Sequence, residues 1–104
     1  MNDFEATVIC AKAFGLQLVD DCKKLDEEKK IIVVRVIGGL RYKYGPLKDG
    51  ESAFDLLERF QLAVDRFPMM EKDIWGWRVK GVDVEHSDIN LKRAITFCAA
   101  KQQA

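Results

Sequence analysis

Residues 29–45 read KKIIVVRVIGGLRYKYG, and this stretch decides the fold that the sequence predicts. The segment Ile31–Ile37 is rich in β-branched residues, which suit the pleated and packed surface of a β-strand. Gly38 and Gly39 follow it, and a glycine pair between two strand-like runs favours a two-residue turn. We therefore expect a β-hairpin here. Its expected cross-strand pairs are Ile37 with Leu40, Arg35 with Tyr42 and Val33 with Tyr44.

The two strands of this hairpin differ in their pattern of apolar residues. The first is apolar on both faces, which is typical of a strand in the middle of a sheet. The second, Leu40–Tyr44, alternates, because its apolar and aromatic residues point one way while Arg41 and Lys43 point the other. Pro46 follows and offers no N–H to a further strand, so we expect the second strand at an edge. The first strand then needs another neighbour from elsewhere in the chain.

The N-terminal segment predicts a helix, because Asn2 and Glu5 have the spacing of a capping box. Two interpretations remain for the residues beyond Gly15. In the one that we favour, the helix continues to about Glu28, because the apolar residues stay in phase with a helical period. In the other, Gly15 ends the helix and Leu16–Val19 form a short strand.

A second helix is predicted over residues 51–67. Asp49 or Ser52 is a suitable cap at its start, and its apolar residues form a wide stripe along one side. Pro68 should end it, because the residue before a proline avoids the helical conformation.

The segment Ile74–Val84 predicts a third strand, in which Gly81 indicates a bulge or a bend. A third helix is expected over Ile89–Lys101, with Ser87 or Asp88 as its cap. The remaining tail, residues 102–104, is expected to fray.

These elements predict one two-layer α+β domain over residues 1–104, in the order α-β-β-α-β-α. The third strand supplies the missing neighbour of the first through a β-α-β crossover, so we expect a three-stranded, mostly antiparallel sheet in the strand order 2-1-3. The first two helices should cover one face of this sheet. The third helix or a second copy of the chain should cover the other, so a homodimer is one expectation.

Charge and hydropathy restrict the kind of protein. The chain has 104 residues, and its 17 Lys and Arg balance its 17 Asp and Glu, which disfavours non-specific binding to DNA or to a membrane surface. No apolar run approaches the roughly 18 residues of a membrane span. The N-terminus lacks the basic region of a signal peptide, so we expect a cytoplasmic protein.

The residues that often carry chemistry are sparse. The chain has an odd number of cysteines, and they are widely spaced: Cys10, Cys22 and Cys98. We therefore expect reduced thiols packed as small apolar groups. A zinc site usually shows closely spaced cysteines, and none occur here. His86 stands alone. We therefore predict no catalytic residues, no metal and no cofactor, and we rank an enzyme that uses Cys22 or His86 last.

Basic and aromatic residues supply the candidate binding site. The hairpin and the third strand carry basic residues with aromatics close to them in sequence, a composition that can bind single-stranded nucleic acid. The alternation of the strands favours another interpretation, with the aromatics in the core and the basic residues on a solvated face. The candidate binding residues are Arg41, Lys43, Trp75, Trp77, Arg78 and Lys80.

The two tryptophans are the sharpest candidates within this set. Trp75 and Trp77 flank Gly76 and should point to the same side of their strand. If one indole stays exposed with Arg78 or Arg41 at its edge, the pair has the composition of an interface hot spot. The alternative is that both indoles complete the core beneath the second helix.

We therefore expect a small, non-enzymatic binding protein that acts by contact with a protein partner, as an accessory or inhibitor protein. In size and in the order of its elements, helix, hairpin, helix, strand and helix, the chain resembles many short phage and mobile-element proteins. The alternative function is a single-stranded nucleic-acid-binding domain that uses the basic hairpin.

Overall fold

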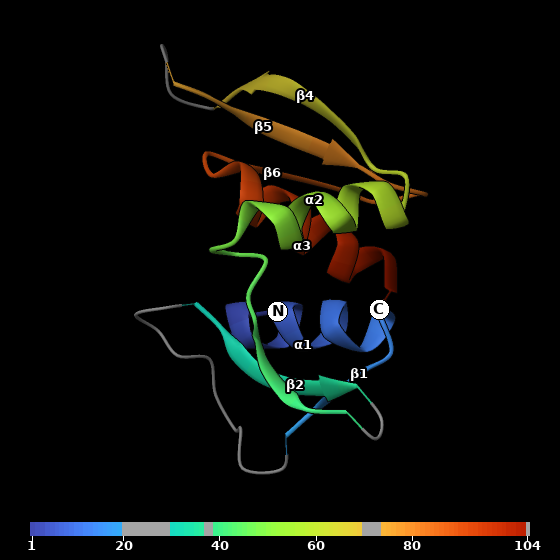
Figure 1. The fold of residues 1–104 in the computed structure, drawn as a ribbon. Helices are drawn as coiled ribbons and strands as arrows, with labels where there is room; N and C mark the ends of the chain where they lie inside the picture. Colours follow the sequence, from blue (N-terminus) through green and yellow to red (C-terminus); the bar gives the residue numbers. More distant parts are fainter. Residues whose placement is uncertain (20–29, 37–38, 70–73, 104) are drawn as a thin grey trace.

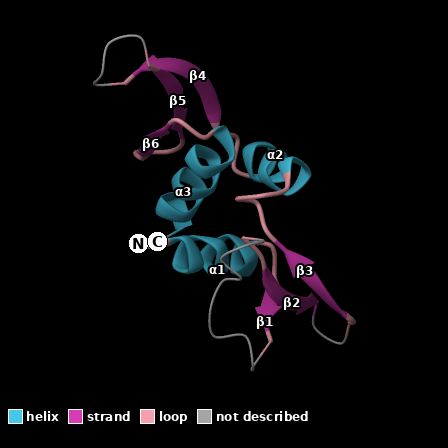
Figure 2. Cartoon of the chain, turned by 90° about the vertical axis from the view of Figure 1, so that its left-hand side faces the viewer, coloured by secondary structure: helices cyan, strands magenta, loops and turns pink. Residues whose placement is uncertain are grey.

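In the computed structural model, which describes residues 1–19, 30–36, 39–69 and 74–103, two three-stranded antiparallel sheets lie at opposite ends of the molecule. Three helices lie between them (Figures 1 and 2). The elements in chain order are α1 (Asp3–Ala13), β1 (Leu16–Leu18), β2 (Ile32–Val36), β3 (Arg41–Tyr44), α2 (Gly50–Arg59), β4 (Ala63–Pro68), β5 (Trp75–Lys80), β6 (Glu85–Asp88) and α3 (Leu91–Gln103). The predicted α+β class is confirmed, whereas the single sheet with order 2-1-3 is wrong.

The first sheet has the order β1-β2-β3, so β2 is central and β3 lies at an edge, as the sequence predicts. The second neighbour of β2 is β1, and the segment 74–84 belongs to the other sheet. The predicted β-α-β crossover is therefore absent from the described residues. The helix favoured to about Glu28 is also wrong, because α1 ends at Ala13. The part of that prediction on residues 20–28 lies outside the described residues.

Gly15 explains why α1 ends where it does. Its φ of +76° lies in the left-handed region, which costs a glycine little and other residues more. Its N–H donates to the carbonyl oxygen of Lys12 over 2.9 Å, which closes the last turn of the helix. The chain then leaves the helix and pairs Leu16–Leu18 with β2. The apolar residues after Gly15 match a helical period, but burial on the sheet decides their conformation.

The hairpin of β2 and β3 is shifted by one residue from the predicted register. Ile32 lies opposite Tyr44 and Val34 lies opposite Tyr42. A shift of one residue exchanges the two faces of one strand relative to the other. The tyrosines therefore share a face with the buried Ile32 and Val34, and this is the face that α1 covers. The expected turn includes residue 38, which lies outside the described residues.

The second helix is shorter than predicted. Asp49 caps it, because its carboxylate accepts from the N–H of Glu51 over 3.2 Å and from the hydroxyl of Ser52 over 2.8 Å. The helix ends at Arg59, and Gln61 has a left-handed φ of +52°. The prediction of helix to residue 67 is wrong, since Ala63–Pro68 form strand β4.

The predicted strand over residues 74–84 is a hairpin in the structure. The N–H of Gly81 donates to the carbonyl oxygen of Val84 over 2.9 Å, and Asp83 has a φ of +58°. The chain reverses there, so the expected bulge is a turn that joins β5 to β6. The second sheet has the order β4-β5-β6.

The third helix also has different ends from those predicted. Asn90 caps it by accepting from the N–H of Arg93 over 3.0 Å, whereas the expected caps, Ser87 and Asp88, lie in β6. It continues to Gln103, so part of the tail that was expected to fray is helical. Gln102 holds this end by accepting from the N–H of Val82 over 2.9 Å.

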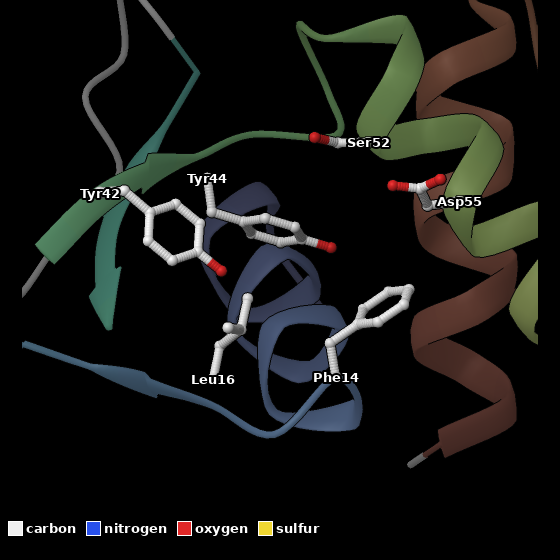
Figure 3. A pocket seen from close by; sticks show the side chains of 6 residues that line it. All are labelled: Phe14, Leu16, Tyr42, Tyr44, Ser52 and Asp55. Atoms are coloured by element: carbon white, nitrogen blue, oxygen red, sulfur yellow. The ribbon is translucent and has the colours of Figure 1, made fainter. Parts of the chain in front are cut away.

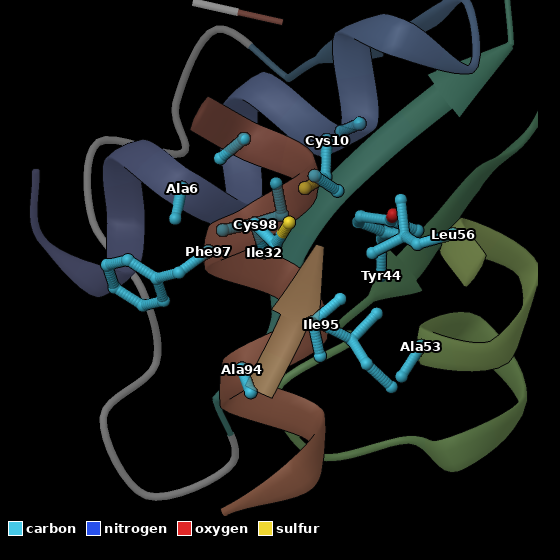
Figure 4. Close-up of a cluster of buried hydrophobic side chains, with 14 of the residues drawn as sticks. Ala6, Cys10, Ile32, Tyr44, Ala53, Leu56, Ala94, Ile95, Phe97 and Cys98 are labelled. Carbon is cyan, nitrogen blue, oxygen red and sulfur yellow. The ribbon is translucent and has the colours of Figure 1, made fainter. Parts of the chain in front are cut away.

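α3 forms the centre of the molecule. It packs against α1, α2, β5 and β6, and every residue from Ala94 to Ala100 is buried (Figure 4). The side of α1 in this core is made of small residues, including Ala6, Cys10 and Ala11, which allow two helices to approach closely. None of the described helices has the length and apolar character that crossing a membrane requires.

We predict that Gly15→Ala lowers the free energy of unfolding by about 1 kcal/mol, because alanine is strained in the left-handed region. A Cβ at Gly15 would meet no atom within 4 Å, so the loss would come from the backbone alone. Urea unfolding followed by circular dichroism measures the effect.

Gly50→Ala is the matched control, since its Cβ would make an ordinary contact 3.7 Å from Lys92. It should leave stability unchanged or raise it. Equal stability of the two variants would show that the backbone of Gly15 does not determine the end of α1.

Candidate functional site

The predicted binding residues do not form one surface. Arg41 and Lys43 lie on β3 in the first sheet, and the other four lie on β5 in the second sheet. Within β5 they divide again, because Trp75 and Trp77 point to one face while Arg78 and Lys80 point to the other. The two sheets lie at opposite ends of the molecule (Figure 1), so Arg41 is not at the edge of either indole.

The basic residues of the first sheet gather on one face. Arg35 lies directly opposite Arg41, and Lys43 lies opposite Val33, all on the side away from the tyrosines. Arg35, Arg41 and Lys43 are exposed, and no ion pair joins any of them to a described residue. We call these three residues the basic face. It has cations without aromatics beside them, which matches the interpretation that alternation separates the two classes.

The tryptophans lie on a face of the second sheet with two residues of β4. Trp75 is opposite Pro68, and Trp77 is opposite Arg66, whose guanidinium lies 4.8 Å from the indole centre. We call these four residues the tryptophan face. Trp77 packs against the core, but Trp75 is 55% exposed. One indole is therefore exposed, but the arginine beside the pair is Arg66, and neither Arg78 nor Arg41 lies at the edge of the exposed ring.

Arg78 is engaged on the opposite face of the same sheet. Its guanidinium donates to both carboxylate oxygens of Asp65, over 2.9 and 3.3 Å, and lies 4.9 Å from the centre of the Phe67 ring. The hydrogen bonds from Arg78 hold the pKa of Asp65 below its usual value. Arg78 therefore stabilises the pairing of β4 with β5 on a face that is separate from the tryptophans.

A pocket of about 290 Å³ opens between the first sheet and α2 (Figure 3). We call it the tyrosine pocket. Its lining residues are Phe14, Leu16, Tyr42, Tyr44, Ser52 and Asp55.

Tyr44 is the unusual member of this lining. The residue is only 7% exposed, and its buried hydroxyl has no hydrogen-bond partner among the described residues. Figure 3 shows that hydroxyl directed from β3 towards Phe14 and Asp55. Burial raises the pKa of Tyr44, and smaller electrostatic effects of Cys10, Tyr42 and, last, Asp55 raise it further, so the phenol is neutral near pH 7. A buried polar group without a partner is costly to retain, and such groups are rare.

His86 belongs to a cluster that joins three elements. Its Nδ1 lies 2.9 Å from the ammonium nitrogen of Lys101, and its ring stacks on Phe97 at 5.1 Å. Burial lowers the pKa of His86, and the positive charge of Lys101 lowers it further. In the same cluster, Arg93 binds Asp3 of α1 and also Asp88 of β6, the latter over 3.1 Å. The described contacts of His86 thus hold β6 against α3.

The cysteines within the described residues lie in the core. Cys10 and Cys98 are buried free thiols, and the thiol of Cys10 donates to the carbonyl oxygen of Thr96 over 3.4 Å. Burial raises the pKa of Cys10 to about 12, which keeps it in the thiol form near pH 7. Cys22 lies outside the described residues. No group of three or more His, Cys, Asp or Glu side chains in the described part of the chain could hold a metal ion.

Comparison with known proteins gives no match to a protein-family model, to a curated protein or to a solved structure.

We predict that Tyr44→Phe raises the free energy of unfolding by about 1 kcal/mol, because it removes a buried hydroxyl that has no described partner. Thermal or urea unfolding measures the change. Tyr42→Phe is the matched control. Tyr42 is 43% exposed, so loss of its hydroxyl should change the free energy of unfolding by less than about 0.5 kcal/mol. A loss of stability in Tyr44→Phe would indicate that the hydroxyl is hydrogen-bonded in solution.

Proposed function

We propose that the chain is a small, non-enzymatic binding protein that acts by contact with a protein partner, as an accessory or inhibitor protein. The observation that carries the proposal is the 55% exposure of Trp75 on the tryptophan face. A cytoplasmic location, an origin in a phage or mobile element, and homodimer formation stay predictions.

An exposed indole is a large apolar surface to leave in water. Covering a tryptophan side chain removes up to about 250 Å² from solvent, and tryptophan and arginine are enriched among the residues that dominate binding energy. Trp75 has Pro68 directly opposite, and the next pair on the same face is Trp77 with Arg66. Both pairs lie on paired strands, so the contact surface is held in place before a partner arrives.

The partner is expected to be a protein because of the mixed character of this face. The stacking of Arg66 on Trp77 keeps a cation beside the exposed apolar surface. Aromatic residues and arginine are enriched at the centres of protein–protein interfaces, where other charged residues are depleted.

Trp75→Ala is expected to weaken partner binding by about 2 kcal/mol or more, the usual effect of removing a hot-spot tryptophan. The partner is first captured from a lysate of the source organism and identified by mass spectrometry. Calorimetry with the purified partner then measures the affinity of each variant.

Val82→Ala is the matched control, because Val82 is 72% exposed in the turn between β5 and β6. It should bind like the unaltered chain, and both variants should unfold at similar urea concentrations. If the two variants bind the purified partner equally well, Trp75 is not part of the interface and the proposal loses its support.

The second candidate is single-stranded nucleic-acid binding through the basic face. Like charges directly opposite in a sheet are destabilising, and Arg35 lies opposite Arg41. An anionic ligand would offset this repulsion. Tyr42 and Tyr44 share the other face of the sheet, so the contacts would be to phosphate rather than by stacking on these rings.

This candidate predicts binding to a single-stranded oligonucleotide that weakens steeply between about 50 and 200 mM salt. Arg41→Ala and Lys43→Ala should each weaken binding and lower the salt slope by about 1 in a gel-shift titration. Lys80→Ala, on the second sheet, is the control and should retain the affinity. Equal losses in all three variants would point to general charge attraction and count against a site on the basic face.

A further inference from the structure

We propose that the tyrosine pocket binds the cationic end of an arginine or lysine side chain presented by the protein partner. This inference rests on the proposed function for the source of the side chain. The pocket joins three segments that are far apart in the sequence, since Phe14 and Leu16 flank the end of α1, the tyrosines lie on β3 and Asp55 lies on α2.

The first argument is the hydroxyl of Tyr44. It is buried, directed into the pocket and without a partner among the described residues (Figure 3). Because less than 1 Å² of this oxygen is accessible, a guanidinium or ammonium group in the pocket donates a hydrogen bond to it only after neighbouring side chains of the lining move. The hydrogen bond formed in the complex would then offset the free-energy cost of burying the hydroxyl, and a tyrosine at this position would serve binding.

The second argument is the carboxylate of Asp55, the charged side chain in the lining. No described residue forms an ion pair with it, and the residue is exposed. Asp49, the cap of the same helix, differs because its carboxylate already accepts hydrogen bonds from the Ser52 hydroxyl and the Glu51 N–H. An unpaired carboxylate beside a neutral phenol favours a cation and repels an anion.

The third argument is the aromatic wall. The rings of Phe14, Tyr42 and Tyr44 all line the pocket, and ring faces attract cations. Arg59 of α2 already lies over the Phe14 ring, with its guanidinium 5.3 Å from the ring centre. This internal contact already occupies a face of Phe14, so the aromatic wall offered to an incoming cation consists of the two tyrosine rings.

The size of the pocket limits its occupant. Its volume of about 290 Å³ is just below the range for small-molecule sites, which begins near 300 Å³. One extended side chain with a charged end fits this space better than a nucleotide or another large cofactor. A side chain also arrives already attached to a partner surface, which lowers the entropy that binding has to overcome.

The test uses a capped amino acid in place of the unidentified partner. N-acetyl-L-arginine methylamide is titrated into the ¹⁵N-labelled protein, and N-acetyl-L-citrulline methylamide serves as its neutral analogue of the same shape. The arginine probe should shift the amide signals of Leu16, Tyr42, Ser52 and Asp55, and the citrulline probe should not. Equal shifts with the two probes would overturn the proposal.

Two variants locate the interaction. Asp55→Asn should weaken binding of the arginine probe about tenfold, and Tyr44→Phe should weaken it about threefold while the protein stays folded. Asp83→Asn is the matched control, because it makes the same chemical change at an exposed turn of the second sheet, where asparagine tolerates the positive φ. If Asp55→Asn and Asp83→Asn bind the probe equally, the charge of Asp55 does not act in the pocket and the inference fails.

The outcome for the pocket can be separated from that for the protein partner. A purified partner that binds Asp55→Asn as tightly as the unaltered chain, and loses affinity with Trp75→Ala, would refute the pocket and keep the proposed function. Selective binding of the arginine probe, together with equal partner affinity of Trp75→Ala and Val82→Ala, would support the pocket and remove the support for the tryptophan face.

Discussion

Burial of α3 on all its sides is the constraint on which the rest of the structure depends. A helix that is buried all round needs neighbours in every direction, and the described chain supplies α1, α2, β5 and β6. Small residues on α1 let that helix lie close, while Thr7 and Thr96 direct their hydroxyls to carbonyl oxygens one turn earlier in their own helices, each over 2.7 Å. The two sheets therefore share a core through this helix without sharing a strand.

The beginnings of the first two helices were easier to predict from the sequence than their ends. Asn2 and Asp49 are short polar caps, and each does accept the N–H expected of it. The ends depend on backbone conformation. At position 15 the residue type itself, glycine, indicates a left-handed conformation. Gln61 adopts the same conformation although glutamine does not favour it. After Gly15, packing of the two leucines of β1 against the core favours the strand. After Gln61 the strand is largely exposed, and its pairing with β5 holds it in place.

The candidate sites were predictable only in part, for a related reason. The placement of both tryptophans on the same side of one strand is a local pattern, but the exposure of Trp75 was expected from an edge position, whereas β5 is central in its sheet. The basic face and the tyrosine pocket depend instead on the register between β2 and β3, and a shift of one residue moves Tyr42 from the side of Arg35 to the side of Val34. The pocket also needs α2 to bring Asp55 beside β3, which no pattern within either segment reveals.

The place of α3 in the chain order has a consequence for the speed and cooperativity of folding. Contacts that close the core join residues far apart, since Cys10 and Thr96 are separated by 86 positions and Asp3 and Arg93 by 90. The entropy of closing such a loop must be overcome before these contacts stabilise anything, and a topology rich in distant contacts folds slowly for its length. α1 can cover the first sheet alone, but the other side of α1 and the inner face of the second sheet stay exposed until α3 docks between them. We therefore expect the core to form late in folding, when α3 docks, and the whole chain to fold as one cooperative unit.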